Sequence, residues 1–382
     1  MTRPHQHPLQ QILENRIAII DGAMGTTIRT YGLTEADMRG ERFKNSTKDL
    51  KNNGDLFTLT QPRTICDIHR RFLEAGADII ETNTFGATSI AQSEFFVDDP
   101  RERGGRKDPA FYQKVIDDEF LNALAWEINE QSALQCREWA DRAANATGRQ
   151  RFVAGAIGPL TVSLSNSPDA DDAGFRVVTF DQVKAAYAQQ VRALIAGGVD
   201  LLLVETIFDS LNAKAALVAI RELFDGDGLA ASNRELPVMI SAAVGRGGET
   251  LISAQTTEAF WNAVAHAKPL SVGLNCSLGP DLMYPFLAEL SEKADVAISC
   301  YPNAGLPNPL SATGFDLGPQ DMARYLSDFA RAGLINIAGG CCGNTPEHIA
   351  AIARTLDGMP PRKFGGAVPA EESYALQNED RP

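Results

Sequence analysis

Two cysteines with no residue between them, Cys341 and Cys342, lie in the stretch IAGGCCGNTPEHI, residues 337–349. A third cysteine, Cys276, ends the stretch PLSVGLNC. Thiolates bind zinc at about 2.3 Å, and three protein ligands leave the fourth tetrahedral position for water or substrate. If these three side chains converge, they predict a catalytic zinc site rather than a closed structural one.

Three glycines, Gly339, Gly340 and Gly343, flank the adjacent cysteines. Glycine adopts backbone angles that other residues rarely adopt. We therefore expect these glycines to let two consecutive side chains turn towards one ion.

The other three of the six cysteines have simpler interpretations. Cys66, Cys136 and Cys300 fit small residues of the apolar core. Cys300 lies in a strand, one or two residues too early to reach its end. If it did reach the end, it would close the metal site as a fourth ligand and favour a structural role.

Two other uses of the cysteine pair are weaker. A vicinal disulfide is strained and is disfavoured in a reducing compartment. A nucleophilic cysteine needs a base, usually histidine, and the five histidines are not well placed for it. They are His5 and His7 in the N-terminal tail, His69 and His266 in helical stretches, and His348, which we expect to point away.

Composition excludes several classes of protein. The 382 residues are 44% hydrophobic and 22% charged, as in ordinary globular proteins. The net charge of −14 is opposite to that of a nucleic-acid binder and unsuited to anionic membranes. The sequence has no apolar run long enough for a membrane span and no apolar signal-peptide core at its start. We therefore expect a cytoplasmic protein with reduced thiols.

Eight short apolar runs alternate with helical patterns along the chain. The runs are 16–24, 77–85, 151–159, 199–207, 237–244, 269–276, 295–303 and 335–342. This repeated alternation predicts an α/β fold, a (β/α)₈ TIM barrel, with an open doubly wound sheet as the alternative. We expect one domain over residues 12–358 and a flexible tail or linker stub over 359–382. The stretches 96–115 and 225–235 are expected at the surface.

Polar, small or sulfur-bearing residues end most of the predicted strands. In a barrel, the carboxyl ends of all strands open on one face, where active sites lie. Residues far apart in sequence should therefore meet there. They include Asp21, Gly22, Glu81 to Thr84, Gly158, Glu205, Thr206, Asn275, Cys276, Asn303, Cys341 and Cys342.

The combination of GLNCSLGP and GGCCGNTPEHI resembles the zinc motif of the homocysteine S-methyltransferase family. Within it, the sequence is most similar to the N-terminal homocysteine-binding module of cobalamin-dependent methionine synthases. The resemblance covers about residues 12–358. Supporting stretches are DGAMGTTIRTYGLTEADMRGERF, AGADIIETNTFGATSIA, ETIFDSLNAKAA, SAQTTEAF and PNAGLPN.

The resemblance implies Zn²⁺ bound by Cys276, Cys341 and Cys342, with homocysteine sulfur at the open position. A free thiol is mostly protonated at neutral pH, and a bound metal ion deprotonates it. The expected reaction is an in-line methyl transfer to sulfur that gives methionine. The nucleophile is the substrate thiolate, so no catalytic side chain is expected.

The resemblance also indicates which residues bind the rest of homocysteine. Asp21 and Glu205 are expected near the amino group, although such carboxylates could instead cap helices or form structural ion pairs. Backbone amides around Gly22 and Ala23 are expected near the carboxylate. Asn303, in the PNAG stretch, is expected to occupy the open zinc position before substrate arrives, or else to be a turn former.

Further residues are expected to support these groups. Glu81, Thr82 and Asn83 would complete the pocket or lie behind it, and Asn275 would brace the ligand geometry.

The sequence says less about the methyl donor than about the zinc ligands. The resemblance implies methylcobalamin carried by a separate chain or module, because no cobalamin-binding DxHxxG motif occurs here. One alternative is a small donor, betaine or S-methylmethionine. Betaine would require an aromatic cage, and only Phe85, Phe208 and Tyr301 are near strand ends. The other alternative is a non-catalytic barrel, stabilised by zinc, that binds homocysteine.

Overall fold

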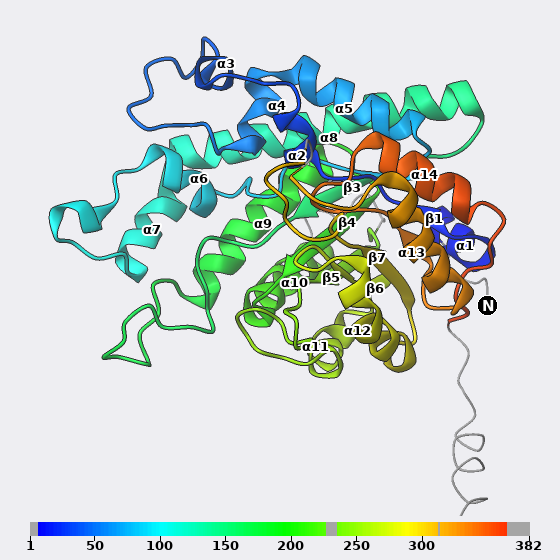
Figure 1. Ribbon diagram of the computed structural model, residues 1–382. Coiled ribbons are helices and arrows are strands. Elements are labelled where there is room, and N and C mark those ends of the chain that lie inside the picture. The colour runs from blue at the N-terminus through cyan, green and yellow to red at the C-terminus, as the bar shows by residue number, and fades with distance from the viewer. Residues whose placement is uncertain (1–6, 227–234, 312–313, 365–382) are drawn as a thin grey trace, which may run out of the picture.

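The computed structural model describes residues 7–226, 235–311 and 314–364 (Figure 1). Eight parallel strands form one sheet in the order β1-β8-β7-β6-β5-β4-β3-β2, and a bridge between Ile20 and Ile79 joins its two ends. The sheet is therefore a closed (β/α)₈ barrel, as predicted, and the open-sheet alternative is wrong. The strands are β1 (Ala18–Ile19), β2 (Ile79–Glu81), β3 (Phe152–Ile157), β4 (Leu201–Ile207), β5 (Val238–Ala242), β6 (Ser271–Asn275), β7 (Ala297–Tyr301) and β8 (Ile337–Ala338).

Each strand lies inside one of the eight apolar runs, because barrel strands are buried on both faces. In β4, Leu201 and Leu203 point into the barrel, whereas Leu202 and Val204 pack against the helices. Alternation of this kind produces two cores, one inside the barrel and one between the sheet and the helices.

Helices surround the strands (Figure 1). The α-helices are α1 (Pro8–Asn15), α2 (Met24–Arg29), α3 (Glu35–Arg39), α4 (Phe57–Thr60), α5 (Pro62–Glu74), α6 (Ser89–Phe96), α7 (Pro109–Asp117), α8 (Glu119–Thr147), α9 (Phe180–Ala196), α10 (Ser210–Asp225), α11 (Thr257–Val264), α12 (Pro280–Lys293), α13 (Pro319–Arg331) and α14 (Pro346–Leu356). Short 3₁₀ helices are η1 (Gly54–Leu56), η2 (Pro100–Arg103) and η4 (Ala265–Ala267).

The helices form where the sequence has apolar residues at helical spacing. In α5, Ile65, Ile68 and Phe72 are completely buried along one face. The helix α9 begins with a capping box between Thr179 and Gln182. These local signals explain why helices form between the apolar runs.

The N-terminal end of the barrel is closed by α1 and by a buried ion pair. Leu9 and Leu13 of α1 pack into the core inside the barrel. Asp78, with no exposed surface, accepts hydrogen bonds from Arg16 at 2.7 Å and Arg151 at 3.2 Å. At this end of the barrel the buried charge of Asp78 is paired, which is typical of a region that serves stability.

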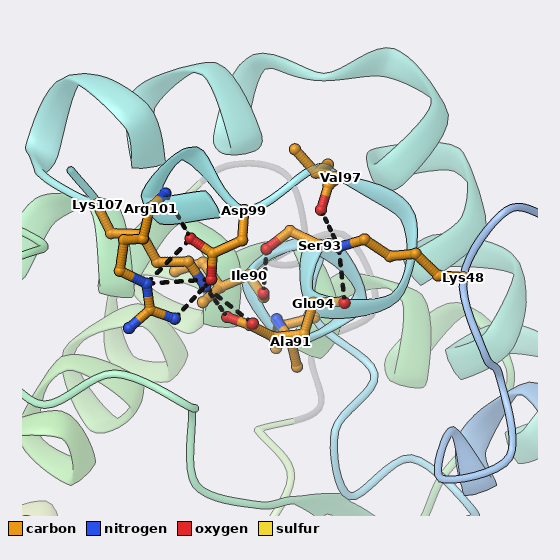
Figure 2. A network of polar contacts seen from close by, with 10 residues as sticks. Lys48, Ile90, Ala91, Ser93, Glu94, Val97, Asp99, Arg101 and Lys107 are labelled. Atoms are coloured by element: carbon orange, nitrogen blue, oxygen red, sulfur yellow. Dashed lines mark hydrogen bonds and ion pairs between the residues drawn. The ribbon is translucent and has the colours of Figure 1, made fainter. Parts of the chain in front are cut away.

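The predicted surface excursion at 96–115 contains η2 and most of α7. Figure 2 shows Lys107 between Glu94, at 2.8 Å, and Asp99, at 3.6 Å. Arg101 also pairs with Asp99, at 2.6 Å. Tyr112 of α7 is 1% exposed, so the segment is anchored by burial as well as by charge.

Parts of some predictions lie outside the described residues. The stretch 227–234 of the predicted polar loop and residues 365–382 of the predicted tail are among them. The domain boundaries at 12 and 358 stay predictions. Across the described ranges, no helix combines the length and apolar character needed to cross a membrane.

Candidate metal centre and substrate cavity

The three predicted metal ligands meet at the carboxyl ends of β6 and β8. The sulfur atoms of Cys276, Cys341 and Cys342 all lie within 4.8 Å of one another. The sulfurs of Cys276 and Cys342 are 3.8 Å apart. Among residues 7–226, 235–311 and 314–364, no other group of three potential metal ligands is as close.

A turn of unusual backbone conformation brings Cys276 to this cluster. Cys276 and Ser277, directly after β6, have φ angles of 57° and 52°. Positive φ is uncommon for residues other than glycine and is stored where surrounding contacts enforce it. One such contact is the hydrogen bond from the Ser277 hydroxyl to the Val244 carbonyl, at 2.7 Å. Nothing in the sequence indicates this conformation.

The glycines around the cysteine pair act differently from our expectation. Only Gly343, with φ of 83°, has a positive φ angle. Gly339 and Gly340 are required for space: a Cβ at these positions would lie 2.4 Å from Ile20 and 2.1 Å from Asn344. Close packing, rather than unusual backbone angles, is thus the reason for two of the three glycines.

The three thiols strongly affect one another's ionisation. Hydrogen bonds from Cys276 and Cys341 lower the pKa of Cys342 to about 3. Hydrogen bonds with Cys276 and Cys342 raise the pKa of Cys341. These interactions favour the thiolate form of Cys342 and the protonated form of Cys341. A divalent cation would allow all three to ionise, which makes the cluster a fitting donor set for zinc.

The remaining cysteines do not join the cluster. Cys300 is completely buried, and its thiol donates to the sulfur of Met283 on α12, at 3.6 Å. It therefore points into the helix layer and does not close the metal site. Cys136 lies 3.2 Å from Nε2 of His69, and both are completely buried. Burial raises the pKa of Cys136 well above its usual value, so this pair provides no thiolate nucleophile.

A cavity of about 460 Å³ lies over the cluster at the C-terminal face of the barrel. Four carboxyl groups line it, those of Asp21, Asp55, Glu81 and Glu205, together with the three cysteines. None of the described residues that line it is lysine, arginine or histidine. The cavity is therefore suited to a ligand that carries positive charge.

The carboxyl groups of Asp21 and Glu205 are buried, and Glu81 beside them is half-buried. Burial raises the pKa of Asp21 well above its usual value. Burial, and next the negative charge of Cys276, raise the pKa of Glu205 to about 8. Oδ1 of Asp21 is buried without a hydrogen-bond partner, whereas Oδ2 accepts from the Glu81 amide at 3.1 Å. An unpartnered carboxyl oxygen of this kind indicates a binding site for a donor from the ligand.

Asn275 connects the strands beneath the cavity. Its Nδ2 donates to Thr206 Oγ1 at 2.8 Å and to Glu205 Oε2 at 3.4 Å. Its Oδ1 accepts from Ser241 at 2.7 Å. Thr206, with φ of 53°, lies at an irregularity in the pairing of β4 with β5. Asn275 thus holds the Glu205 side chain and the irregular segment of β4 in place. We expected it instead to fix the geometry of the cysteines.

Gly22 and Ala23 line the cavity, as expected for residues whose backbone contacts a ligand. A Cβ on Gly22 would lie 2.7 Å from the Asn344 carbonyl oxygen, so no larger residue fits there. Asn303 is 6% exposed, and its Oδ1 has no hydrogen-bond partner. It does not line the cavity, but the next residue donates to the Cys342 carbonyl at 2.9 Å. The roles of these residues stay predictions.

A larger cavity, of about 740 Å³, lies outside the barrel and contains no cysteine. It is lined by residues of the 96–117 and 161–177 segments, including Lys107 and Arg106. These cations are already paired, Lys107 with Glu94 and Arg106 with Asp169. The smaller cavity, which contains the three cysteines, is therefore the candidate site.

The chain is similar to known proteins over most of its length. The family model described as homocysteine S-methyltransferase matches residues 18–356. The chain is similar to the metallated homocysteine methyltransferase MmuM from Escherichia coli, with 20% identity and a TM-score of 0.63, covering 91% of this chain and 99% of that one. The apo form of MmuM gives 19% identity and a TM-score of 0.59, covering 92% and 100%.

At these identities the solved structures establish the fold, and the family model establishes the family. The match spans the barrel from β1 to α14 and includes all three clustered cysteines. This chain is a methyltransferase and belongs to the homocysteine S-methyltransferase family.

Proposed function

We propose that this chain methylates the sulfur of homocysteine at a zinc ion held by Cys276, Cys341 and Cys342. The observation that carries the proposal is the cluster of three sulfurs within 4.8 Å at the floor of an acidic cavity. A Lewis-acidic zinc bound there supplies a low thiol pKa, so that the substrate sulfur is present as thiolate.

Asp21 and Glu205 bind the ammonium group of homocysteine in this proposal. Both carboxyl groups are buried, and no cation among the described lining residues competes for them. An ammonium group favours the charged form of each carboxyl, which offsets the effect of burial on its pKa. The unpartnered Oδ1 of Asp21 supports this role, because the ammonium provides the missing donor.

Among the described residues that line the cavity, no side-chain cation is present to bind the substrate carboxylate. We propose that backbone amides at Gly22 and Ala23 bind it, since both residues line the cavity. Asn303 is proposed as an oxygen donor to the open zinc position before substrate arrives. The buried, unpartnered Oδ1 of Asn303 supports that proposal.

We propose methylcobalamin on a separate chain or module as the methyl donor. Two stretches support this donor, TEADMRGERF and ETIFDSLNAKAA, which resemble cobalamin-dependent methionine synthases. Such a donor would approach at the C-terminal face, where the cavity lies. Because the clustered cysteines require reduced thiols, we also propose a cytoplasmic location.

A small sulfonium donor such as S-methylmethionine is the second candidate. The observation that favours it is the charge of the cavity, with four carboxyl groups and no lining cation among the described residues. A sulfonium ion would be attracted to this cavity and would lose its charge on methyl transfer. Betaine is less favoured, because the aromatic residues that line the cavity are limited to Phe85, Phe95 and Tyr301.

Turnover experiments with zinc-loaded protein distinguish these donors. Methionine is measured after incubation of homocysteine with methylcobalamin, S-methylmethionine or betaine. Turnover with methylcobalamin supports the first proposal, and turnover only with a small donor replaces it with the second.

Metal-edge absorption spectroscopy tests whether the barrel is catalytic at all. On addition of homocysteine, we expect the zinc coordination to change from three sulfurs and one lighter atom to four sulfurs. Unchanged coordination, together with no methionine from any donor, would favour the non-catalytic alternative.

A further inference from the structure

Asn344 is a residue near the metal centre to which the proposed function gives no role. It lies two residues after Cys342 and is completely buried. It is not among the described residues that line the substrate cavity, so a ligand bound there would not touch it. Any part that Asn344 has in the chemistry therefore acts through its neighbours.

The side-chain amide of Asn344 joins two strand ends. Its Nδ2 donates to the carbonyl oxygen of Pro302, after β7, and to that of Cys341, after β8, both at 3.0 Å. Because carbonyl oxygens only accept, the amide must present its nitrogen to them. The backbone amide of Asn344 also donates to the Cys341 carbonyl, at 3.0 Å. One residue thus holds the turn that contains both cysteines and connects it to β7.

Backbone hydrogen bonds join the same two segments. The Cys341 amide donates to the Pro302 carbonyl at 2.8 Å, and the Ala304 amide donates to the Cys342 carbonyl at 2.9 Å. These bonds do not depend on the Asn344 side chain. Without that side chain the turn should therefore still form, but with fewer restraints on the cysteines.

Close packing fixes the position of Asn344. A Cβ on Gly340 would lie 2.1 Å from the Cγ of Asn344, and a Cβ on Gly22 would lie 2.7 Å from its carbonyl oxygen. The side chain therefore lies directly against the glycine that precedes the cysteine pair. A donor held in this way restrains the carbonyl groups that it binds.

We propose that Asn344 is a positioning residue for the metal centre: its side-chain amide restrains the turn that carries Cys341 and Cys342, so that both sulfurs face Cys276. This inference rests on the proposed binding of zinc by these cysteines. Hydrogen bonds that orient metal ligands contribute about 10–100-fold to metal affinity in proteins. Three thiolates repel one another, and a restrained turn removes part of the cost of bringing them together.

Asn129 provides a matched control. It is also completely buried, in α8, and its Nδ2 donates to two backbone carbonyls, those of Ala87 at 2.6 Å and Ala125 at 2.7 Å. In both asparagines, Oδ1 has no hydrogen-bond partner. The variants N344A and N129A therefore remove the same groups, and both should lose a similar amount of thermal stability. Only N344A should change the metal centre.

Zinc affinity separates the two variants. Each purified protein is titrated with zinc in competition with a chromophoric chelator of known affinity. We expect N344A to bind zinc about 10–100-fold more weakly than wild type, and N129A to stay within about twofold of it. Equal zinc affinities of N344A and N129A overturn the inference.

The N344S variant keeps the inference testable if N344A does not fold. A serine hydroxyl is a single donor, which serves at most one of the two carbonyl groups. We expect N344S to bind zinc about three- to tenfold more weakly than wild type, and more tightly than N344A. If N344S binds zinc as tightly as wild type, Asn344 does not position the cysteines.

Cobalt-substituted protein gives a readout of geometry rather than of stability or activity. The absorption bands of Co²⁺ bound by thiolates report the coordination geometry. These bands should shift in N344A and stay unchanged in N129A, and unchanged bands in N344A overturn the inference. If wild-type protein binds zinc but transfers no methyl group, the proposed function fails and this inference stands. If wild-type protein binds no zinc, both fail.

Discussion

Asp78 directly precedes β2 and Glu81 ends it, yet they lie at opposite ends of the barrel with opposite electrostatic surroundings. At the N-terminal end, Asp78 pairs with Arg16, Arg149 and Arg151, at 2.7, 3.1 and 3.2 Å. At the C-terminal end, Glu81 lies with two buried carboxyl groups and no lining cation among the described residues.

This difference shows that the buried charge at the N-terminal end is paired without a ligand, whereas the carboxyl groups at the C-terminal end have no cation. A buried charge with its partners in place contributes to a stable fold, whereas buried carboxyl groups without a cation cost stability. Buried carboxyl groups without a cation are typical of functional sites, where the ligand provides the opposite charge. The acidic end of this barrel is therefore shaped for binding, and the paired end for folding.

The largest expected effect is on the metal centre. Cys276→Ser should remove most of the bound zinc and lower the turnover rate by about a hundredfold or more, because only two thiolates remain. Zinc content by elemental analysis and methionine formation measure both effects. Cys300→Ser is the matched control, since this thiol points into the helix layer, and it should retain zinc. Loss of zinc in both variants would contradict the assignment of ligands.

A substitution at the N-terminal end of the barrel should change the free energy of unfolding rather than the affinity for substrate. Asp78→Ala leaves the buried Arg151 without its carboxylate partner, and we expect the free energy of unfolding to fall by about 3–5 kcal/mol. Denaturant titration measures this loss. The KM for homocysteine should stay near its wild-type value in the folded fraction. A KM change as large as that of a cavity variant would show that the two ends are coupled.

A buried histidine predicts how stability depends on pH. In the folded protein, burial lowers the pKa of His69 to about 4, from 6.5. Between these values the unfolded chain binds the additional proton, so stability falls as pH decreases from 6.5 to about 4, by about 3 kcal/mol in total. Denaturant titrations at several pH values should show this fall in wild-type protein and a smaller one in His69→Gln. Equal slopes in the two proteins would contradict the prediction.

The smallest expected effect is at Asp21. Asp21→Asn removes a buried carboxyl group that has no cation, but keeps an oxygen that can accept from the Glu81 amide. We expect unchanged or slightly higher thermal stability and a KM for homocysteine about tenfold higher. Thermal unfolding and steady-state kinetics measure the two changes. If Asp21→Asn lost as much stability as Asp78→Ala, the carboxyl groups at both ends of the barrel would serve folding alike, which would contradict the comparison.

The sequence by itself determined the barrel and predicted that Cys276, Cys341 and Cys342 would meet at its C-terminal face. Barrel strands are buried on both faces and therefore appear as continuous apolar runs, such as 199–207 around β4. Since parallel strands all end on one face, the positions of Cys276 and Cys341 at strand ends were enough to bring them together. The chemistry of thiolates then indicated zinc.

Only the tertiary structure decided how the ends of the strands are shaped and charged. The positive φ of Cys276 depends on contacts from other strands, as does the bracing of Glu205 by Asn275. Gly340 is explained by its distance to Asn344, which local sequence does not encode. The pKa of Glu81 is raised by burial and by the charges of Glu205 and Asp21, which are distant in sequence. Local patterns specify which surfaces are apolar, but the pKa of a buried group and the strain of a turn depend on neighbours that only folding brings together.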